Sequence, residues 1–228
     1  MRHYAILVAA LLGVSAIVGC GGSGKSTPNS FVRVVHASPD APNVDVLVDN
    51  RIAIQNLGYG EVAGYRSVAA GHRNIKVNAA GTSTTVIDAG VDLVERESYT
   101  VLAAGFLAQI APIVLRDDRS APPAGKVNVR VVHAAASAPE VDVYVVPSGA
   151  SIDSATPVLE DVPFRAASGY LPVNPGRYDL FVTVAGTKDI AISANNVSVT
   201  AGQARTVIAL DAKGGGAPFR LEFLADRN

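Results

Sequence analysis

An internal repeat constrains this chain of 228 residues more than any other feature of its sequence. The hexapeptide VRVVHA at 32–37 returns at 129–134, and the tripeptide VDV at 44–46 returns at 141–143. Both segments recur 97 residues later and in the same order. Self-similarity of this kind predicts two copies of one structural unit.

The rest of the repeat sets the expected domain boundaries. Gly64-Tyr65 returns as Gly169-Tyr170, so the second copy carries additional residues in a loop before this landmark. We expect the first domain over 31–120 and the second over 127–228. The linker at 121–126 contains two prolines and is expected to be short and fairly stiff.

Each copy is predicted to consist of β-strands. The segment VDVLVD alternates so that Val44, Val46 and Val48 share one face, which is the period of a half-buried strand. Turns rich in glycine and proline separate about seven such runs in each copy, and no stretch after the leader keeps a helical period. The sequence therefore predicts an all-β fold of two tandem immunoglobulin-like β-sandwich domains, without the Cys–Trp–Cys trio of antibody domains.

These motifs resemble a known family. VRVVHASPDAPNVDVLVD at 32–49, followed by GYRSVAAGHRNIKV at 64–77, is similar to DUF4397, a domain of unknown function found, often in tandem, in bacterial envelope lipoproteins and archaeal surface proteins. The resemblance covers nearly the whole mature chain, although the second copy replaces Ser-Pro-Asp with Ala-Ala-Ser. It implies a surface or periplasmic β-domain and brings no established activity or catalytic residues.

The first thirty residues are typical of an exported lipoprotein. A short basic start and an apolar run ending at Val18 have the pattern of a secretory signal, too short to span a membrane comfortably. Ile17-Val18-Gly19-Cys20 resembles the lipobox of bacterial lipoproteins, which implies a signal peptide at 1–19 and a lipid on Cys20, the only cysteine. The alternative is a plain secretory signal with Cys20 as a bystander.

The lipobox resemblance also implies a location. Several acyl chains on Cys20 would anchor the protein stably to a membrane of the cell envelope, and residues 20–30 would form a flexible tether. Residue 21 is glycine rather than aspartate, which favours the outer membrane if the cell is Gram-negative.

Net charge argues against nucleic acid as a partner, and the context of one motif argues against a nucleotide. A formal net charge of −1 gives no basic field for nucleic acid. GCGGSGKS at 19–26 formally fits the phosphate-loop pattern, but that motif needs a core strand before it and a helix after it. Here a leader precedes it and Thr27-Pro28 follows, so we expect no nucleotide binding.

Four repeated polar residues are the candidates for chemistry. His36 with Asp45, and His133 with Asp142, could be metal ligands or a general base with its orienting carboxylate. Neither pair has a third ligand at a recognisable spacing. Because a corner that defines the fold must occur in every copy, we favour a structural role for all four, with no metal and no cofactor.

Other repeated polar residues have similar alternatives. Arg33 and Arg130 could bind an anion, but we expect them to face solvent or to pair with the repeated aspartates of neighbouring strands. Tyr65 and Tyr170 are expected to be buried rings whose hydroxyls tie down a connection. The pair Asp117-Asp118 could hold calcium, although a solvated edge is the default expectation.

No catalytic motif is present after the leader. We therefore expect a membrane-anchored, non-catalytic envelope lipoprotein that binds another envelope protein or a polysaccharide, with the longer connection at 147–161 as the first place to look for recognition. The alternatives are a metal-dependent or enzymatic protein that uses the His/Asp pairs, and a purely structural spacer.

Overall fold

The computed structural model describes residues 28–228. The predicted signal peptide, Cys20 and most of the predicted tether lie outside the described residues. Within them the chain forms strands, one 3-10 turn η1 (Leu107–Gln109) and no helix of the length and apolar character needed to span a bilayer. The strands of the first copy are β1 (Asn29–Ala37), β2 (Val44–Val48), β3 (Arg51–Leu57), β4 (Val62–Ala69), β5 (Gly71–Ala79), β6 (Thr85–Leu93), β7 (Ser98–Ala104) and β8 (Ala111–Asp117). Those of the second copy are β9 (Val127–His133), β10 (Val141–Pro147), β11 (Leu159–Val162), β12 (Leu171–Val173), β13 (Gly176–Val184), β14 (Ile190–Val199), β15 (Ala204–Leu210) and β16 (Arg220–Arg227).

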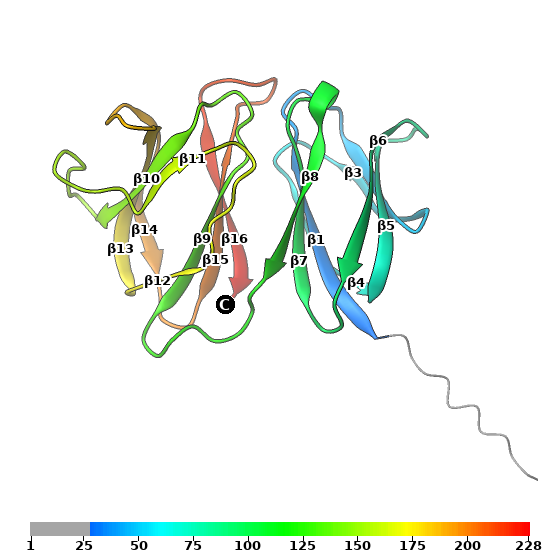
Figure 1. Ribbon diagram of the computed structural model, residues 1–228, viewed down its shortest axis with the longest axis horizontal. Coiled ribbons are helices and arrows are strands. Elements are labelled where there is room, and N and C mark those ends of the chain that lie inside the picture. The colour runs from blue at the N-terminus through cyan, green and yellow to red at the C-terminus, as the bar shows by residue number, and fades with distance from the viewer. Residues whose placement is uncertain (1–27) are drawn as a thin grey trace, which may run out of the picture.

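Each copy is a sandwich of two four-stranded sheets. An inner sheet, β4-β1-β7-β8 in the first copy and β12-β9-β15-β16 in the second, faces the other domain. An outer sheet, β3-β2-β5-β6 or β11-β10-β13-β14, covers the far side (Figure 1). The predicted all-β fold of two tandem sandwiches is confirmed, with eight strands per copy in the described chain rather than about seven.

The strand that sequence reasoning missed is β3. It lies at the edge of the outer sheet, and most of its residues are exposed or half-buried. Ile52 is 55% exposed, so the apolar residues of this segment do not mark a buried face. An edge strand of this kind gives a weak periodic signal.

The first strand of each copy pairs with two neighbours in different directions. β1 runs antiparallel to β4 and parallel to β7, and β9 likewise runs antiparallel to β12 and parallel to β15. Val34 packs into the core of the first sandwich, whereas the adjacent Val35 faces the second domain. Because both faces are covered, β1 is buried almost throughout instead of alternating between buried and exposed residues.

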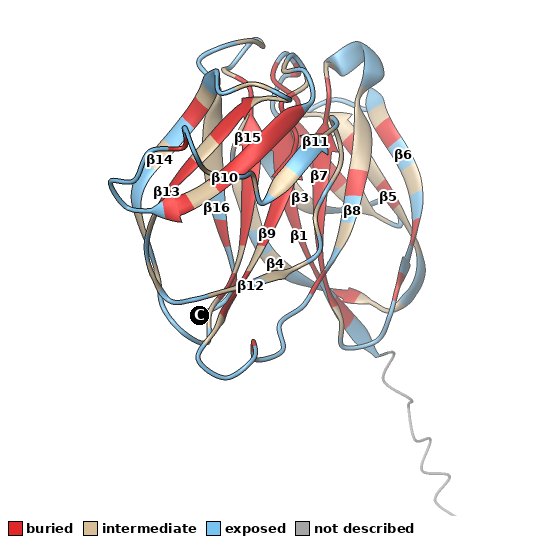
Figure 2. Cartoon of the chain, turned by 60° about the vertical axis from the view of Figure 1, so that its left-hand side comes forward, coloured by how far each residue is buried: buried red, intermediate tan, exposed pale blue. Residues whose placement is uncertain are grey.

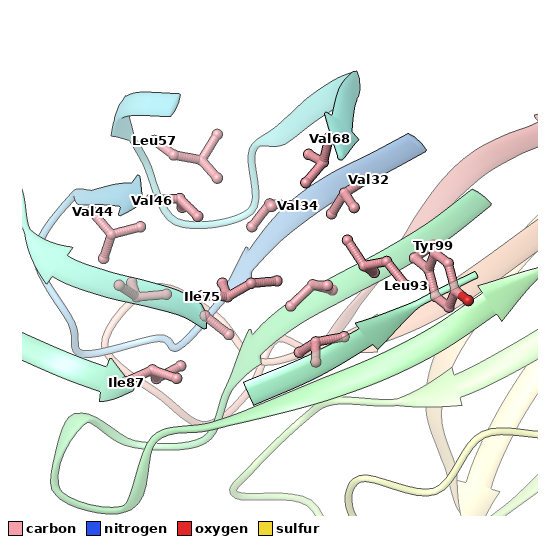
Figure 3. Close-up of a cluster of buried hydrophobic side chains, with 14 residues drawn as sticks. Val32, Val34, Val44, Val46, Leu57, Val68, Ile75, Ile87, Leu93 and Tyr99 are labelled. Atoms are coloured by element: carbon pink, nitrogen blue, oxygen red, sulfur yellow. The ribbon is translucent and has the colours of Figure 1, made fainter. Parts of the chain in front are cut away.

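The core of the first sandwich is continuous and well filled. Fourteen buried residues form one cluster between its two sheets. Figure 3 shows Tyr99 lying beside Leu93 and Val32 within this cluster. A hollow between the two sheets has a volume of about 10 Å³, at the lower limit of the roughly 10–15 Å³ that a water molecule needs.

A separate apolar core joins the two domains. Val35 and Leu102 from the first copy meet Val132 and Ile208 from the second, and all four are fully buried. Figure 1 shows the inner sheets side by side, with β1, β7 and β8 opposite β9, β15 and β16. Figure 2 shows that the buried residues run through these inner sheets. The two sandwiches therefore form one packed body.

Two buried ion pairs cross this interface. Arg33 of β1 binds Asp226 of β16, and Arg130 of β9 binds Asp117 of β8. The side chains of both arginines are 4% exposed and those of both aspartates are fully buried. Each domain thus supplies the cation for one pair and the carboxylate for the other, so the interface follows the symmetry of the repeat.

Each aspartate receives further donors from its own domain. The Thr100 hydroxyl accepts a hydrogen bond from Arg33 Nε at 2.8 Å and donates to Asp117. The Tyr65 hydroxyl also donates to Asp117 at 2.8 Å, and its ring lies under the Arg33 guanidinium, 4.9 Å from the centroid. Burial raises the pKa of Tyr65, which keeps the hydroxyl protonated as a donor. The second copy repeats the set with Arg130, Thr206, Tyr170 and Asp226.

These contacts correct three expectations. Arg33 and Arg130 neither face solvent nor pair with Asp45 and Asp142, because the sheet that carries them is covered by the other domain. The Tyr65 hydroxyl binds a carboxylate in the interface rather than a connection. Asp117 is a buried partner of arginine and not part of a solvated edge, whereas the adjacent Asp118 is exposed. A sequence pattern reports the faces of one domain and does not reveal that a second domain covers one of them.

Candidate functional site

The two repeated histidines organise corners of the fold. His36 Nε2 donates to the Pro42 carbonyl at 2.9 Å, and His36 Nδ1 accepts from the Ser38 amide at 3.4 Å. His133 repeats this with the Pro139 carbonyl and the Ala135 amide. These contacts use both ring nitrogens and fit the neutral imidazole with its hydrogen on Nε2. Burial lowers the pKa of both histidines below the ordinary value, which also favours the neutral ring.

The two repeated aspartates each hold a β-bulge and a turn of the outer sheets. Asp45 accepts from the Asn56 amide at 2.8 Å and from the Gly81 amide at 2.9 Å. Asn56 has a φ of 54° and Gly81 a φ of 71°, so the carboxylate holds two residues whose backbone is left-handed. Asp142 makes the same two bonds to the amides of Asp161 and Gly186.

The structure does not bring each histidine to its aspartate. No hydrogen bond or ion pair joins His36 to Asp45 or His133 to Asp142 among the described residues, because each side chain is committed to a different turn. Across residues 28–228, no three His, Cys, Asp or Glu side chains gather closely enough to hold a metal ion. The geometry therefore offers no support for the metal-dependent or enzymatic alternative.

An apolar cavity lies inside the second sandwich. It has a volume of about 620 Å³ and lies between the inner and outer sheets of that domain. That volume is within the roughly 300–1,000 Å³ of small-molecule sites, which are likewise mostly apolar with a few polar groups. Aliphatic side chains from six strands line it, among them Val129, Val131, Val145, Leu171, Leu180, Val197 and Val207.

The same space in the first sandwich is filled. The strand registers show which positions correspond, because Val32 pairs with Tyr99 in β1 and β7 as Val129 pairs with Arg205 in β9 and β15. Gly71 likewise pairs with Leu93 as Gly176 pairs with Val199. The first-copy residues Val32, Val68, Val91 and Leu93 are all buried, whereas their counterparts Val129, Val173, Val197 and Val199 are partly exposed.

One substitution between the copies accounts for much of this difference. Tyr99 is 5% exposed, and its ring fills the end of the first core. Its hydroxyl accepts from the Val94 amide at 3.0 Å. Arg205 occupies the same position in the second copy and lines the cavity instead of filling it. An arginine brings no ring and keeps its charged end toward water.

The edge strand of the inner sheet also differs between the copies. β4 pairs with β1 over most of its eight residues, whereas the same edge of the second copy is interrupted, since β12 pairs with β9 at Leu171, Pro172 and Val173 and Ala167 forms a separate bridge to Val132. The additional residues of the second copy precede this short strand. Leu171, Pro172 and Val173 of this interrupted edge line the cavity.

The longer connection at 147–161 also contributes to the cavity. Val158 lines it and is 47% exposed. The connection itself is held down, since Ile152 packs on Tyr144 and Lys188 Nζ donates to the Ile152 and Ala155 carbonyls at 2.7 Å. Its predicted role in recognition remains a prediction.

A larger hollow lies beside the linker and has a different character. It measures about 770 Å³ and is lined mainly by polar and charged residues from the end of each domain. Its arginines Arg96 and Arg116 pair with Glu95 and Glu97, and Arg119 donates to the Asp226 carbonyl. Since these groups already have partners within the chain, we place the candidate site in the second sandwich.

Apart from Val158, which lies in the connection at 147–161, sequence reasoning did not identify the residues that line this cavity. The valines look like ordinary strand residues, and only the change from Tyr99 to Arg205 between aligned copies could have indicated a difference in packing. Even that signal is ambiguous without the strand register, because an arginine in a strand is usually expected to face solvent.

Comparison with known proteins gives one strong match. The family model described as "Domain of unknown function (DUF4397)" matches residues 30–144 and 148–228. The first segment extends past the linker into β10, so the two segments do not coincide with the two sandwiches. No curated protein matches the chain.

Solved structures give only distant likenesses. The family 26 carbohydrate-binding module CBMbc from Eubacterium rectale Amy13K, solved with maltoheptaose, is 11% identical, with a TM-score of 0.26 over 86% of this chain and 95% of that one. A streptococcal virulence factor solved for its α-glucan binding is 11% identical, with a TM-score of 0.25 over 78% and 92%. Likenesses at this level carry no inference about ligand.

Proposed function

The chain belongs to the DUF4397 family of domains of unknown function, and from that premise we propose that it is a non-catalytic binding module whose ligand site is the apolar cavity of the second sandwich. The observation that carries the proposal is the contrast between the copies. Protein interiors are close-packed, and the first copy achieves this with the same strands. A cavity retained in one copy only is best explained by a ligand that enters it.

The lining supports binding rather than catalysis. Its polar side chains are those of Tyr178, Ser198 and Arg205, and the described lining contains no histidine, cysteine or carboxylate. A general base beside a nucleophile is the usual minimum for acyl or glycosyl transfer. The apolar walls also offer few hydrogen-bond partners to a sugar, so the cavity favours an apolar ligand over the polysaccharide that the sequence suggested.

The location that we propose follows from the leader. With a lipid on Cys20 and the tether at 20–30, the protein would sit on a membrane of the cell envelope, as the lipobox resemblance implies. In this view the first sandwich, which begins directly after the tether, is the rigid support that carries the second. A protein or polysaccharide partner elsewhere on the surface remains a prediction.

A neutral apolar dye tests the proposed site. Residues 28–228 contain every strand of both sandwiches, so we would titrate that segment with Nile red and follow its fluorescence. We expect saturable binding of one dye per chain. The variant Val131→Phe places a ring in the cavity and is expected to abolish this binding, because the space that the dye needs is filled.

The matched control is Val114→Phe on β8, where Val114 is 39% exposed and lies outside the cavity. This variant is expected to bind dye like the original protein, and unfolding curves would establish that both variants fold. Equal dye binding by Val131→Phe, or no saturable binding by the original protein, would refute the proposed function.

A further inference from the structure

We propose that the ligand of this cavity is a single acyl chain that carries an anionic head group, with the chain between the sheets and the head group at Arg205. This inference rests on the proposed function and specifies the chemical class of its ligand. It depends on the charge, the position and the surroundings of one residue.

Arg205 supplies the only charge among the residues that line the cavity. It lies at the start of β15, two residues before the buried Val207, so both side chains point to the sandwich interior. No carboxylate lies within ion-pairing distance of its guanidinium anywhere in residues 28–228. Its described side-chain partner is the neutral side-chain amide of Asn228, whose Oδ1 accepts from Nη1 at 3.3 Å.

An unpaired guanidinium beside an apolar chamber is complementary to an amphiphile. The five N–H donors of arginine match carboxylate and phosphate groups, and a charge-assisted hydrogen bond is stronger where water is partly excluded. The aliphatic lining, with Val129, Val197 and Leu180 facing the chamber, suits a hydrocarbon chain. An apolar ligand without an anionic group would leave the guanidinium without a charged partner.

The place of Arg205 in the molecule agrees with this ligand. The start of β15 lies beside the end of β16, since Ala204 pairs with Arg227. Figure 1 shows the C-terminus and the start of β1 at the same end of the two-domain body. A chain anchored through residues before β1 would therefore hold Arg205 at its anchored end, where amphiphiles from the membrane are available.

The experiment compares ligands that share one chain. We would measure binding of laurate, of dodecanol and of lauroyl-lysophosphatidylglycerol to residues 28–228 by competition with Nile red at a pH where the acid is ionised. We expect the two anionic ligands to bind more tightly than the alcohol. The stronger of the two identifies whether the natural head group resembles a carboxylate or a phosphate.

Variants at Arg205 separate charge from shape. Arg205→Gln is expected to weaken binding of the anionic ligands by about tenfold while leaving dodecanol within about twofold, because the charged bond is lost and the chamber remains. Arg205→Lys keeps a cation and is expected to retain most of the preference. Arg205→Tyr introduces the residue of the first copy and is expected to weaken all three ligands by filling the chamber.

The outcomes distinguish this inference from the proposed function. If Nile red and dodecanol bind but laurate and lysophosphatidylglycerol gain no advantage, or if Arg205→Gln leaves their affinity unchanged, the head-group assignment is wrong and the apolar site stands. If neither the dye nor any of the three ligands binds the original protein, both proposals fail.

Discussion

At the scale of single residues, most equivalent positions of the two copies make the same contacts, and one pair of positions has opposite effects on core packing. His36 and His133 make the same two hydrogen bonds, and Asp45 and Asp142 each hold a β-bulge and a turn. Tyr99 and Arg205, in contrast, share a place in the strand pairing and differ in what they do to the core. Repetition therefore marks residues that the fold requires, and the departure from repetition marks the candidate site.

The corner histidines predict a dependence of stability on pH. Burial lowers the pKa of His36 and His133 in the folded state, so below the ordinary value of about 6.5 the unfolded chain binds protons that the folded chain does not. Stability is then retained above that pH and falls as the pH drops from about 7 to about 5, by at most about 1.4 kcal/mol per pH unit for each histidine.

Urea unfolding across this range checks the effect. We expect the double variant His36→Gln with His133→Gln to be less stable at neutral pH and to lose most of the slope. His72→Gln is the control, because the His72 side chain is 71% exposed and its loss should leave the slope in place. A slope that persists in the double variant would show that other groups cause it.

At the scale of elements, strand length and edge position decide where the sandwich is open. β4 and β12 hold the same place in their sheets, but the edge of the second copy is interrupted between Ala167 and Leu171. The connection at 147–161 adds Val158 to the lining of the cavity. The insertion that the repeat revealed thus lies beside the candidate site.

Much of the architecture could be predicted from the sequence because strands and turns are specified by residues that lie close together in the chain. Alternation in VDVLVD and the glycine- and proline-containing turns are local signals, and the repeat doubles each of them. The domain interface and the cavity are not local. Arg33 finds Asp226 almost two hundred residues away, and the cavity depends on how far an edge strand extends and on which side chain fills one position. No period in the sequence carries that information.

At the scale of the whole molecule, the two sandwiches behave as one folded unit because their inner sheets share a core. Leu102 and Ile208 belong to the apolar cluster that both inner sheets form, and both are fully buried. The crossed pairs Arg33–Asp226 and Arg130–Asp117 fix how the sheets are positioned, since a buried charge is tolerated only with its partner. This rigidity holds the cavity at a constant place relative to the start of the chain.

The crossed pairs predict strong coupling between the domains. Arg33→Met leaves the carboxylate of Asp226 buried without its cation and is expected to cost about 3–5 kcal/mol. The double variant Arg33→Met with Asp226→Leu removes both charges and is expected to recover most of that loss. A double-mutant cycle measured by urea unfolding tests this.

The exposed pair Arg116–Glu97 provides the comparison for that cycle. Its arginine side chain is 63% exposed, so Arg116→Met is expected to leave the unfolding midpoint unchanged. If the losses from Arg33→Met and Asp226→Leu simply add, the crossed pair does not couple the domains.

The measurement that tests the central claim most directly is an NMR titration with Nile red. Residues 28–228 would be labelled on the methyl groups of valine and leucine, and the shifts of these methyl signals would be followed as dye is added. The account predicts shifts at Val131, Val145, Leu180 and Val207, which line the cavity. It predicts none at Val34, Val48 and Val101, the counterparts in the filled core, or at the exposed Val114. Shifts in both sandwiches alike, or at surface methyls with the cavity methyls unchanged, would contradict the claim that the second sandwich holds the binding site.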